Sequence, residues 1–308
     1  MAINSFDFQA KLTGELDKAL EQKSVTSFME DNSFGAQFVG SNSVVIPDVS
    51  FSGLGNYDRN TGFPEGSILV NNTTYRLSME RARSFQLDRM DADETSIAGL
   101  AGKVMSEFVR TKVAPEIDAY VFSKLADIIS DRGQYIMETG EGTLEENSVA
   151  FLNEAIDRVH NNAGYDEELV AFVNPTFYTA LMNSPMLDRH IEISNFQKGE
   201  VNTQVKKFNG VTLIPVPASR IRTNIKFYDG ISSSETMGGF LSGLGSKAIY
   251  FLVMPKSAVK LVKKTEKIRI FSPDQNPEMD AYKLDYRIYY DAFVKNSAVE
   301  TIFGYIES

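Results

Sequence analysis

The sequence contains no cysteine and only two histidines, which excludes several kinds of functional site. Without thiolates the chain can form neither disulfide bonds nor a cysteine-ligated metal centre, and this composition fits a reducing compartment. His160 and His190 are too few for a metal site with several imidazole ligands in one chain. His190 lies close to Asp188, but no nucleophile is identified beside that pair, so a surface histidine is the favoured interpretation.

Positive charge is also scarce, because 31 Lys and Arg residues face 41 Asp and Glu residues and the formal net charge is -10. Tight binding to nucleic acid depends on Lys and Arg contacts with phosphates, so this balance argues against a nucleic-acid-binding domain. The longest apolar run, Ala248 to Met254, is too short to cross a membrane. The first residues lack the basic start and apolar run of a signal peptide. We expect a soluble intracellular protein without membrane association.

The common catalytic motifs are missing: there is no GxxxxGK[ST], no HExxH and no GxSxG. The segment GGFLSGLGSK has the residues of a phosphate-binding loop without their spacing, and a loop tip explains it. Helix capping and a strand-connecting turn explain two acidic runs better than cation sites do. These runs are Asp88, Asp91, Asp93 and Glu94, and Asp274, Asn276, Glu278 and Asp280. We therefore expect no enzyme, cofactor or metal, and keep a carboxylate-dependent hydrolase as an alternative.

The longest helical signal runs from Asp93 to Arg132, and we call this segment the spine. Apolar residues recur in it at helical spacing, acidic residues mark its start and Gly133 follows its end. Pro115 removes one backbone hydrogen bond and presses on the carbonyl of Thr111, so we expect a bend or break there. Such a helix is too long for the core of a compact domain of this size.

Two segments before the spine have apolar faces without an evident partner. Residues 4–23 repeat apolar side chains at every fourth position, which predicts an amphipathic helix. The strand pattern VVIPDVSF, a glycine-rich tip and the alternating residues from Tyr75 to Leu87 predict one long hairpin. An isolated two-stranded ribbon is marginal in water, so its apolar face needs cover from elsewhere in this chain or from a neighbouring chain.

The remaining chain predicts a compact α/β unit followed by long strands. Helical and strand patterns alternate through the middle third, and Asn174 and Pro175 begin one of its helices. Two strand patterns then run over 258–271 and 281–294, and the second alternates apolar and charged residues. The spine offers an apolar stripe to cover that sheet. We predict an α+β fold in which the α/β unit is inserted between the first and last parts of the chain.

These pieces in this order resemble the major capsid protein of tailed double-stranded DNA bacteriophages. The matching segments are VVIPDVSFSGLGNYDRNTGFPEGSI, FQLDRMDADET, EFVRTKVAPEIDAYVFSKLA, KKFNGVTLIPVPASR and the run from KSAVKLVKKTEKIRIFSPD to YRIYYDAFV. They cover about residues 44–303, nearly the whole chain. The resemblance depends on pattern and segment order, not on a catalytic motif.

The resemblance implies a division of the chain. It assigns residues 1–43 to an N-terminal arm, 44–86 to an extended hairpin loop, 87–144 to a peripheral domain with the spine, 145–253 to an axial domain, and 254–308 to the C-terminal strands of the peripheral domain. In that family the arm and loop reach over neighbouring subunits, and the axial domains surround the axes of hexamers and pentamers.

The function implied is a structural shell protein that self-assembles into an icosahedral virion capsid around double-stranded DNA, built in the bacterial host cytoplasm. Implied partners are other copies of the chain, portal and scaffolding proteins, and a possible decoration protein. An acidic lining suits DNA that must slide in and out. We expect inter-subunit contacts at Tyr57, Asp58, Arg59, Phe63 and Glu65 in the loop, at Arg81 and Arg83, and at Met237, Gly238, Gly239, Phe240, Gly243 and Gly245.

One departure from some relatives concerns covalent chemistry. Those relatives join subunits by an isopeptide bond from a lysine in the extended loop, whereas here no lysine occurs between Lys23 and Lys103. We therefore expect a non-covalent shell. An encapsulin-type nanocompartment, which shares the fold and encloses a cargo enzyme, is the second functional hypothesis.

Overall fold

The computed structural model describes residues 24–30, 37–40, 42–60, 62–90, 101–137, 143–184, 191–198 and 201–307. The predicted amphipathic helix over 4–23 lies outside these residues, as do His190, Asp91 and the first residues predicted for the spine. Within them the chain forms four β-sheets and several helices, which confirms the predicted α+β class.

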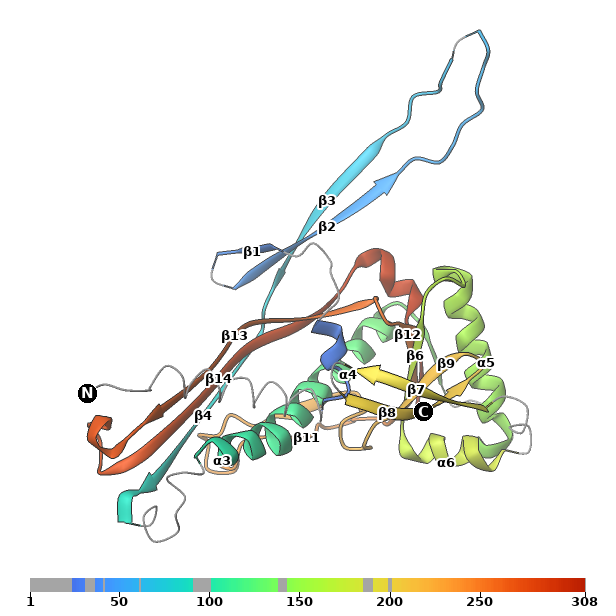
Figure 1. Cartoon of the computed structure of the whole chain (residues 1–308). Helices are drawn as coiled ribbons and strands as arrows, with labels where there is room; N and C mark the ends of the chain where they lie inside the picture. The colour runs from blue at the N-terminus through green and yellow to red at the C-terminus, as the bar shows by residue number, and fades with distance from the viewer. Residues whose placement is uncertain are drawn as a thin grey trace.

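A narrow ribbon of antiparallel strands projects from the rest of the molecule (Figure 1). It consists of β1 (Gln37–Val39), β2 (Ser43–Phe51) and β3 (Ile68–Arg76), in the order β1-β2-β3. β2 and β3 pair along their full lengths, from Ser43 opposite Arg76 to Phe51 opposite Ile68. The predicted hairpin is therefore present, but it ends at Arg76 and not near Leu87.

The residues predicted to continue the hairpin form a separate strand in another sheet. β4 (Met79–Asp88) pairs antiparallel with β14 (Ala281–Val294), which pairs with β13 (Val259–Phe271). A single strand over Tyr75–Leu87 was thus a wrong prediction. The apolar face of its second half is covered within this chain, because Phe85 of β4 packs edge-on against Phe108, a residue of the predicted spine, with ring centroids 4.9 Å apart.

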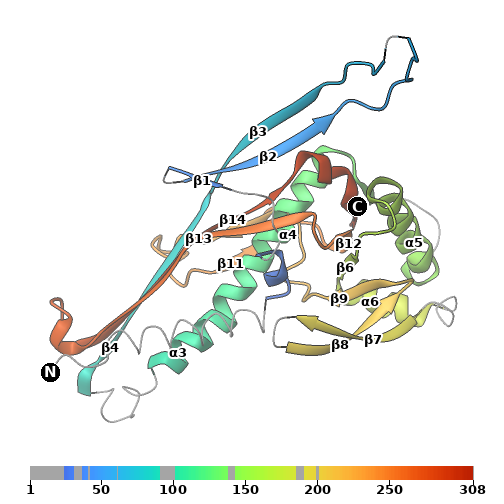
Figure 2. The same cartoon turned by 45° about the horizontal axis from the view of Figure 1, so that its top comes forward.

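The spine is a helical rod with an irregular turn at the predicted place. It comprises α3 (Ala101–Phe108), a π-helical turn (Val109–Val113) and α4 (Ala114–Asp131). Pro115 lies in the first turn of α4, directly after the wide turn in which the Ala114 N–H bonds to the Val109 carbonyl. The π turn makes room for the proline ring. The rod continues without a sharp bend (Figure 2), so the irregularity is a widened turn.

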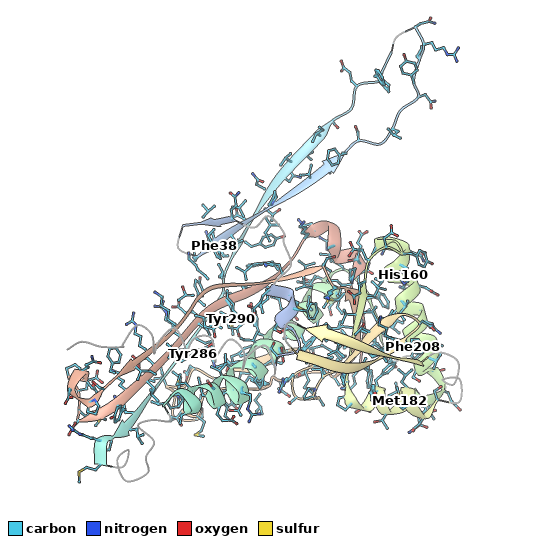
Figure 3. All side chains as sticks on the ribbon, viewed as in Figure 1. Phe38, His160, Met182, Phe208, Tyr286 and Tyr290 are labelled. Atoms are coloured by element: carbon cyan, nitrogen blue, oxygen red, sulfur yellow. The ribbon has the colours of Figure 1, made fainter. Side chains whose placement is uncertain are left out.

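The spine covers one face of the three-stranded sheet, as the alternation in β14 predicts. Leu284, Tyr286, Ile288 and Tyr290 are all buried. Phe108 of the spine packs edge-on against Tyr286 with ring centroids 5.8 Å apart, and Tyr120 packs against Tyr290 at 5.6 Å. Figure 3 shows Tyr286 and Tyr290 in the layer between sheet and helix.

The α/β part is a seven-stranded mixed sheet, in the order β5-β15-β12-β6-β9-β8-β7. Its strands are β5 (Tyr135–Met137), β6 (Leu169–Val173), β7 (Ile191–Lys198), β8 (Val201–Phe208), β9 (Val211–Pro215), β12 (Ile249–Pro255) and β15 (Phe303–Ile306). Helices α5 (Leu144–Ala163) and α6 (Pro175–Asn183) pack on one face, and the spine packs on the other. The side chain of Asn174 accepts a hydrogen bond from the Thr176 N–H at 2.8 Å, so the predicted helix cap is confirmed.

This sheet extends beyond the residues predicted for the α/β unit. β5 and β15 come from outside 145–253, and they pair in parallel with Gly304 opposite Tyr135. All residues of β15 are buried, and β12 lies on its other side. The last strand therefore belongs to the seven-stranded sheet and not with β13 and β14, because its apolar side chains find their cover there. The hairpin β7–β8 was not predicted from the sequence.

Shorter elements join these parts. The 3-10 helix η1 (Ser27–Glu30) packs in the core between the two sheets, where Phe28 stacks on Phe172 at 6.1 Å. β10 (Ile225–Phe227) and β11 (Phe240–Ser242) form a two-stranded sheet beside the spine. The 3-10 helices η5 (Pro273–Gln275) and η6 (Asn296–Thr301) connect β13 to β14 and β14 to β15.

Candidate interaction surface

The ribbon exposes large apolar side chains along most of its length. Phe63 is 88% exposed and Phe51 is 71% exposed, whereas the core side chains in the rest of the described chain are buried. Monomeric proteins rarely expose continuous apolar surface of this extent, and such surfaces mark sites of association. The exposed apolar residues of the ribbon are Phe38, Val39, Val49, Phe51, Leu54, Tyr57, Phe63, Ile68, Leu69 and Val70.

The tip of the ribbon brings together the loop residues predicted for contact. Tyr57 and Phe63 pack edge-on with ring centroids 5.1 Å apart. Between them Asp58 and Gly62 exchange backbone hydrogen bonds of 3.3 and 2.8 Å, and Gly62 has φ +85°, which favours glycine. Asp58 also accepts a bond from the Asn60 N–H at 2.8 Å. The tip is therefore a closed turn that displays an aromatic pair. Arg59 and Glu65 are exposed in the same loop.

The root of the ribbon is fixed by a small hydrophobic cluster. Val44, Ile46 and Leu77 of the ribbon side are buried against Val262 and Phe293 of the three-stranded sheet. The Tyr75 hydroxyl donates to the Val294 carbonyl at 3.2 Å, and the Tyr289 hydroxyl donates to the Leu77 carbonyl at 2.9 Å. These contacts set the direction in which the ribbon leaves the body.

A buried carboxylate holds the point where the ribbon joins β4. Asp291 is fully buried and accepts hydrogen bonds from the Ser78 N–H and hydroxyl, both at 3.0 Å, and from the Tyr120 hydroxyl at 2.7 Å. Lys124 of the spine forms an ion pair with it. Burial, together with the nearby Asp291 carboxylate, raises the pKa of Tyr120, which therefore stays a neutral donor. Sequence reasoning placed Asp291 on the polar face of its strand and missed this role.

A second buried carboxylate anchors the segment that precedes η1. Asp118 of the spine accepts hydrogen bonds from the Ser24 and Thr26 hydroxyls, both at 2.7 Å, and pairs with Arg220 at 3.0 Å. The backbone N–H groups of Val25 and Thr26 donate to it as well, each at 3.2 Å. The signal in the sequence is a lone carboxylate on the apolar stripe of the spine, because a buried charge needs partners.

Arg81 and Arg83 contact the loop around β10 and β11 within the same chain. Arg81 pairs with Glu116 at 2.6 Å and donates to the carbonyls of Tyr228 at 2.8 Å and Gly239 at 3.4 Å. Arg83 donates to the Thr236 carbonyl at 3.0 Å. The structure thus brings together two groups of candidate residues that sequence reasoning treated separately.

The position of this loop differs from the expected one. Met237 to Ser246 were expected in the axial unit. However, Phe227 of β10 packs on Tyr120 of the spine with ring centroids 5.9 Å apart, and the guanidinium of Arg81 lies over the Phe227 ring. The loop therefore lies against the spine and β4. Its side chains Ile231, Met237, Leu241 and Leu244 are exposed. Gly238, Gly239 and Gly245 have positive φ and shape its turns, whereas Gly243 packs against Asn224 and Phe240 pairs with Phe227.

Short hydrogen bonds within the loop depress the pKa of two acidic groups. A bond from the Ser232 hydroxyl, followed by those from the Ile231 and Ser232 N–H groups, lowers the pKa of Asp229 to about 2. A bond from Lys226 lowers the pKa of Glu235. Both carboxylates are thus held ionised, which suits turn formation and not proton transfer at neutral pH.

Where the structure describes them, the acidic residues considered for catalysis or cation binding form local hydrogen bonds and ion pairs. Asp88 accepts a bond from the Met90 N–H at 2.8 Å, and Arg89 lies 3.8 Å from both Asp274 and Asp280. Asn276 binds the Ala281 carbonyl, and Glu278 pairs with Lys283 at 2.9 Å. Among the described residues no group of His, Asp and Glu side chains is arranged to hold a metal ion.

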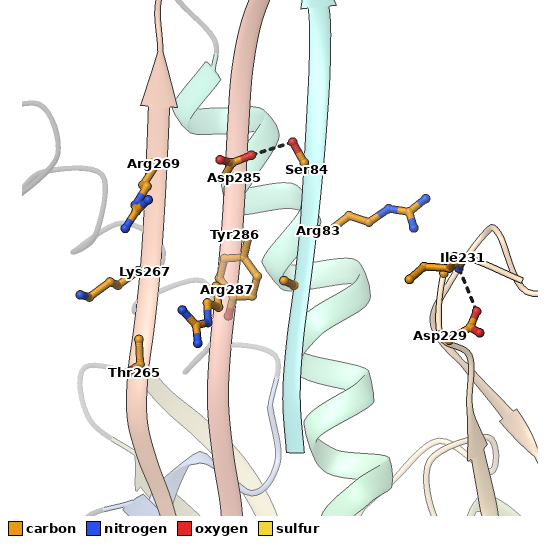
Figure 4. Close-up of a pocket in the computed structure, with 12 residues that line it drawn as sticks. Arg83, Ser84, Asp229, Ile231, Thr265, Lys267, Arg269, Asp285, Tyr286 and Arg287 are labelled. Atoms are coloured by element: carbon orange, nitrogen blue, oxygen red, sulfur yellow. Dashed lines mark hydrogen bonds between the residues drawn. The ribbon is translucent and has the colours of Figure 1, made fainter. Parts of the chain in front are cut away.

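An open depression lies on the outer side of the three-stranded sheet (Figure 4). Lys267 and Arg269 of β13 and Arg287 of β14 line it, together with Asp285, and the Asp229–Ile231 turn lies beyond the edge of β4. Asp285 accepts a bond from Ser84 at 2.6 Å, and Arg287 is paired with Glu80. These side chains form a solvated charged face, in which the described carboxylates are held by neighbouring hydroxyl and guanidinium groups.

The histidine within the described part of the chain also has a local role. His160 stacks on Tyr165 with ring centroids 4.5 Å apart, and its Nδ1 lies 3.1 Å from the Gly164 carbonyl oxygen at the end of α5. None of the helices among the described residues is long and apolar enough to cross a membrane.

Comparison with known proteins gives matches in structure and not in sequence. No protein-family profile and no curated protein sequence matches the chain. The capsid structure of cyanophage P-SCSP1u is similar with a TM-score of 0.57 and 14% identity, over 88% of this chain and 85% of that chain. The mature capsid of bacteriophage PhiM1 is similar with a TM-score of 0.55 and 13% identity, over 87% and 82% of the two chains.

A structure from Gordonia phage Cozz is similar with a TM-score of 0.54 and 14% identity, over 93% of this chain and 87% of that chain. At these identities the similarity concerns the fold. Each of these matches covers most of this chain and most of the other chain. The chain therefore has the fold of phage capsid proteins.

Proposed function

We propose that this chain is the major capsid protein of a tailed bacteriophage, and that its copies assemble into hexamers and pentamers of an icosahedral shell around double-stranded DNA. The observation that carries the proposal is the ribbon. Its root is fixed by buried contacts, while its apolar side chains stay exposed in the single chain. A surface that is rigidly presented and uncovered fits a protein whose neighbours provide the cover.

The roles that we propose for the segments of the chain follow the capsid fold. Residues 1–43 act as the arm, 44–86 as the extended loop, and the spine with β13 and β14 as the peripheral domain. The seven-stranded sheet with α5 and α6 acts as the axial domain, and it includes β5 and β15 in addition to 145–253. The tip residues Tyr57, Asp58, Arg59, Phe63 and Glu65 contact a neighbouring subunit.

Arg81 and Arg83 act in this proposal by holding the loop around β11, so that Met237, Leu241 and Leu244 are presented to a neighbour. A role in proton-transfer catalysis has less support, because the described acids of the two acidic runs cap turns or face cations. We infer a structural protein that works with portal and scaffolding proteins, and with a decoration protein where one exists. Assembly takes place in the host cytoplasm, and the protein remains in the virion.

The net charge of -10 supports a container for DNA, since an acidic lining does not hold phosphates tightly. The absence of lysine between Lys23 and Lys103 supports a shell without isopeptide bonds from the ribbon. Boiling assembled particles in detergent should release single chains on a gel, and covalent ladders would contradict this part of the proposal.

Electron microscopy of the chain, expressed alone and together with its genomic neighbours, tests the proposal. We expect closed icosahedral particles that contain double-stranded DNA when portal and packaging proteins are present. A chain that stays monomeric at high concentration in both conditions would refute the shell function. Particles filled with one protein species and no DNA would instead indicate a nanocompartment.

A further inference from the structure

Strand β3 has one edge that pairs with no other strand in the described part of the chain. It is the last strand of the ribbon sheet, and only β2 pairs with it. An open edge presents unpaired backbone groups that can add a strand from another chain. Whether this edge invites or resists such pairing depends on its residues and on where its backbone groups point.

The pairing of β2 with β3 reveals which backbone groups face the open edge. At one end the Ser52 N–H donates to the Ser67 carbonyl at 3.0 Å, and at the other the Leu77 N–H donates to the Asn42 carbonyl at 2.8 Å. Hydrogen-bonded and non-hydrogen-bonded pairs alternate in an antiparallel ladder. Counting from either end gives the same answer. The pairs that include Ile68, Val70, Asn72, Thr74 and Arg76 are non-hydrogen-bonded, so these five residues point their N–H and C=O groups outward.

The other long open edges are protected against strand addition, and β3 is not. Pro47 of β2 lies opposite Asn72 at an outward position, where it offers no donor. The open strand β13 carries Lys264 at a bulge, followed by Lys267 and Arg269. Charged residues, prolines and bulges are the usual protection of sheet edges. β3 has one charged residue, Arg76, at its root end, and from Ile68 to Tyr75 it contains no charged residue, no proline and no bulge.

The chemistry of this edge favours a second copy of the same strand. Two copies with a net charge of -10 repel each other, so their contact is least costly where charge is absent. Each remaining open-edged strand in the described residues is either three residues long or contains charged residues within its length, whereas β3 has a charge only at its last residue, Arg76. The uncharged stretch from Ile68 to Tyr75 therefore suits a second copy of itself.

We propose that β3 of one copy pairs antiparallel with β3 of a second copy across a two-fold axis at Asn71. In this register Val70 lies opposite the partner's Asn72, and Ile68 lies opposite the partner's Thr74. The four outward residues from Ile68 to Thr74 then form hydrogen-bonded pairs, and Asn71 faces the partner's Asn71 as a non-hydrogen-bonded pair. If the register shifted by one residue, the outward N–H and C=O groups of one copy would lie opposite residues of the other copy whose N–H and C=O groups point toward β2. The pairing rests on the shell assembly proposed above and specifies one of its contacts.

Because the chain has no cysteine, a single Asn71→Cys substitution tests this register directly. Opposed residues of a non-hydrogen-bonded pair have Cα atoms about 4.5 Å apart, within the range of a disulfide. Mild oxidation of assembled full-length N71C should yield a covalent dimer in most chains. The control is Ser50→Cys on β2, which lies on the same face one strand further in and should not crosslink. Particles of N71C that remain uncrosslinked, or equal crosslinking of S50C, would overturn the pairing.

Two proline variants test the hydrogen bonds of the edge. Val70→Pro removes an outward donor from β3, and Val49→Pro removes an outward donor from β2 at the residue opposite. Both positions are exposed and neither donor is used within the ribbon pairing. V70P should lower the fraction of assembled chains about tenfold or more, and V49P should assemble as the wild type does. Equal effects of the two variants would refute the inference.

The outcomes separate this contact from the function itself. If the wild-type chain forms no particles with its genomic neighbours, the shell function fails and the pairing fails with it. If particles form and N71C gives no dimer, only the pairing through β3 fails. Cryo-electron microscopy of the particles gives the same distinction, because paired ribbons would form one continuous sheet across the two-fold axis.

Discussion

The ribbon β2–β3 and the sheet β13–β14–β4 are both built from long antiparallel strands, yet only the sheet covers its apolar face within the chain. In β14 alternate side chains such as Tyr286 and Ile288 are buried under the spine, whereas Phe51 and Val70 of the ribbon are exposed. The same kind of sequence pattern therefore leads to an intramolecular core in one case and to an uncovered surface in the other. Substitutions in the sheet should affect folding, and substitutions in the ribbon should affect association.

The largest effect is expected for a substitution in the body. Phe122 of the spine is fully buried and packs on Phe172 with ring centroids 5.0 Å apart. Phe122→Ala should lower the free energy of unfolding by about 4 kcal/mol, since it leaves a cavity between the spine and the seven-stranded sheet. Urea denaturation of the unassembled chain measures this loss. A change below about 1 kcal/mol would show that the core is not formed as described.

The root of the ribbon should show the next largest effect. Asp291→Asn removes the charge that Lys124 and three further donors satisfy, at a cost of about 3 kcal/mol in the free energy of unfolding. Asp285→Asn on the same strand is the matched control, because that carboxylate is partly exposed and bonds to Ser84. Equal unfolding curves for the two variants would contradict a special role for the buried carboxylate.

The tip of the ribbon should have almost no effect on the stability of the single chain. Phe63 is 88% exposed, so Phe63→Ala should change the free energy of unfolding by less than about 0.5 kcal/mol. The same variant should assemble less well, because the aromatic contact with a neighbour that we propose for Phe63 is lost. Sedimentation analysis of particles measures the second effect. A variant that unfolds more easily yet assembles normally would contradict the conclusion that the ribbon serves association and not folding.

The smallest effect is confined to the loop beside β4. Ser232→Ala removes the strongest of the bonds that lower the pKa of Asp229 to about 2, so this pKa should rise toward its ordinary value of 3.8. A depressed pKa contributes stability above the ordinary value, and that contribution is lost as the pH falls toward 2. The free energy of unfolding of the variant should therefore fall less as the pH drops from 3.8 to about 2. Carboxyl titration by NMR, with Ser233→Ala as the control, measures the shift.

The sequence predicted those parts of the fold that depend on local pattern. The alternation in β14 predicted its buried face, and Asn174 predicted a helix start. Pro115 predicted a bend or break in the spine, and the structure has a widened turn at that place without a sharp bend. Each of these features is set by residues within a few positions of each other. The same is true of the hairpin turn between β2 and β3.

Features that depend on distant partners were missed. Leu77 and Ser78 interrupt the strand because Asp291 and Tyr289 bind them, and both lie more than 200 residues later in the chain. β15 joins the seven-stranded sheet because β5 and β12 offer edges to it, which no local pattern indicates. The partners of Arg81 within the chain were also not predicted, because Glu116 lies on the spine and Tyr228 and Gly239 lie in the loop around β10 and β11.

The buried carboxylate at the ribbon root has a mechanical consequence. The ribbon is a lever of up to about 53 Å, at ~3.3 Å per residue from Ser78 to Gly62 at the tip. A tilt of about 5° at its root would displace the far end by about 4.6 Å, close to the ~4.8 Å that separates neighbouring strands. Small angular errors at Asp291 would thus be magnified into misalignment by a whole strand. The ion pair and hydrogen bonds at the root therefore hold the narrow ribbon in one direction, so that its tip reaches a defined position.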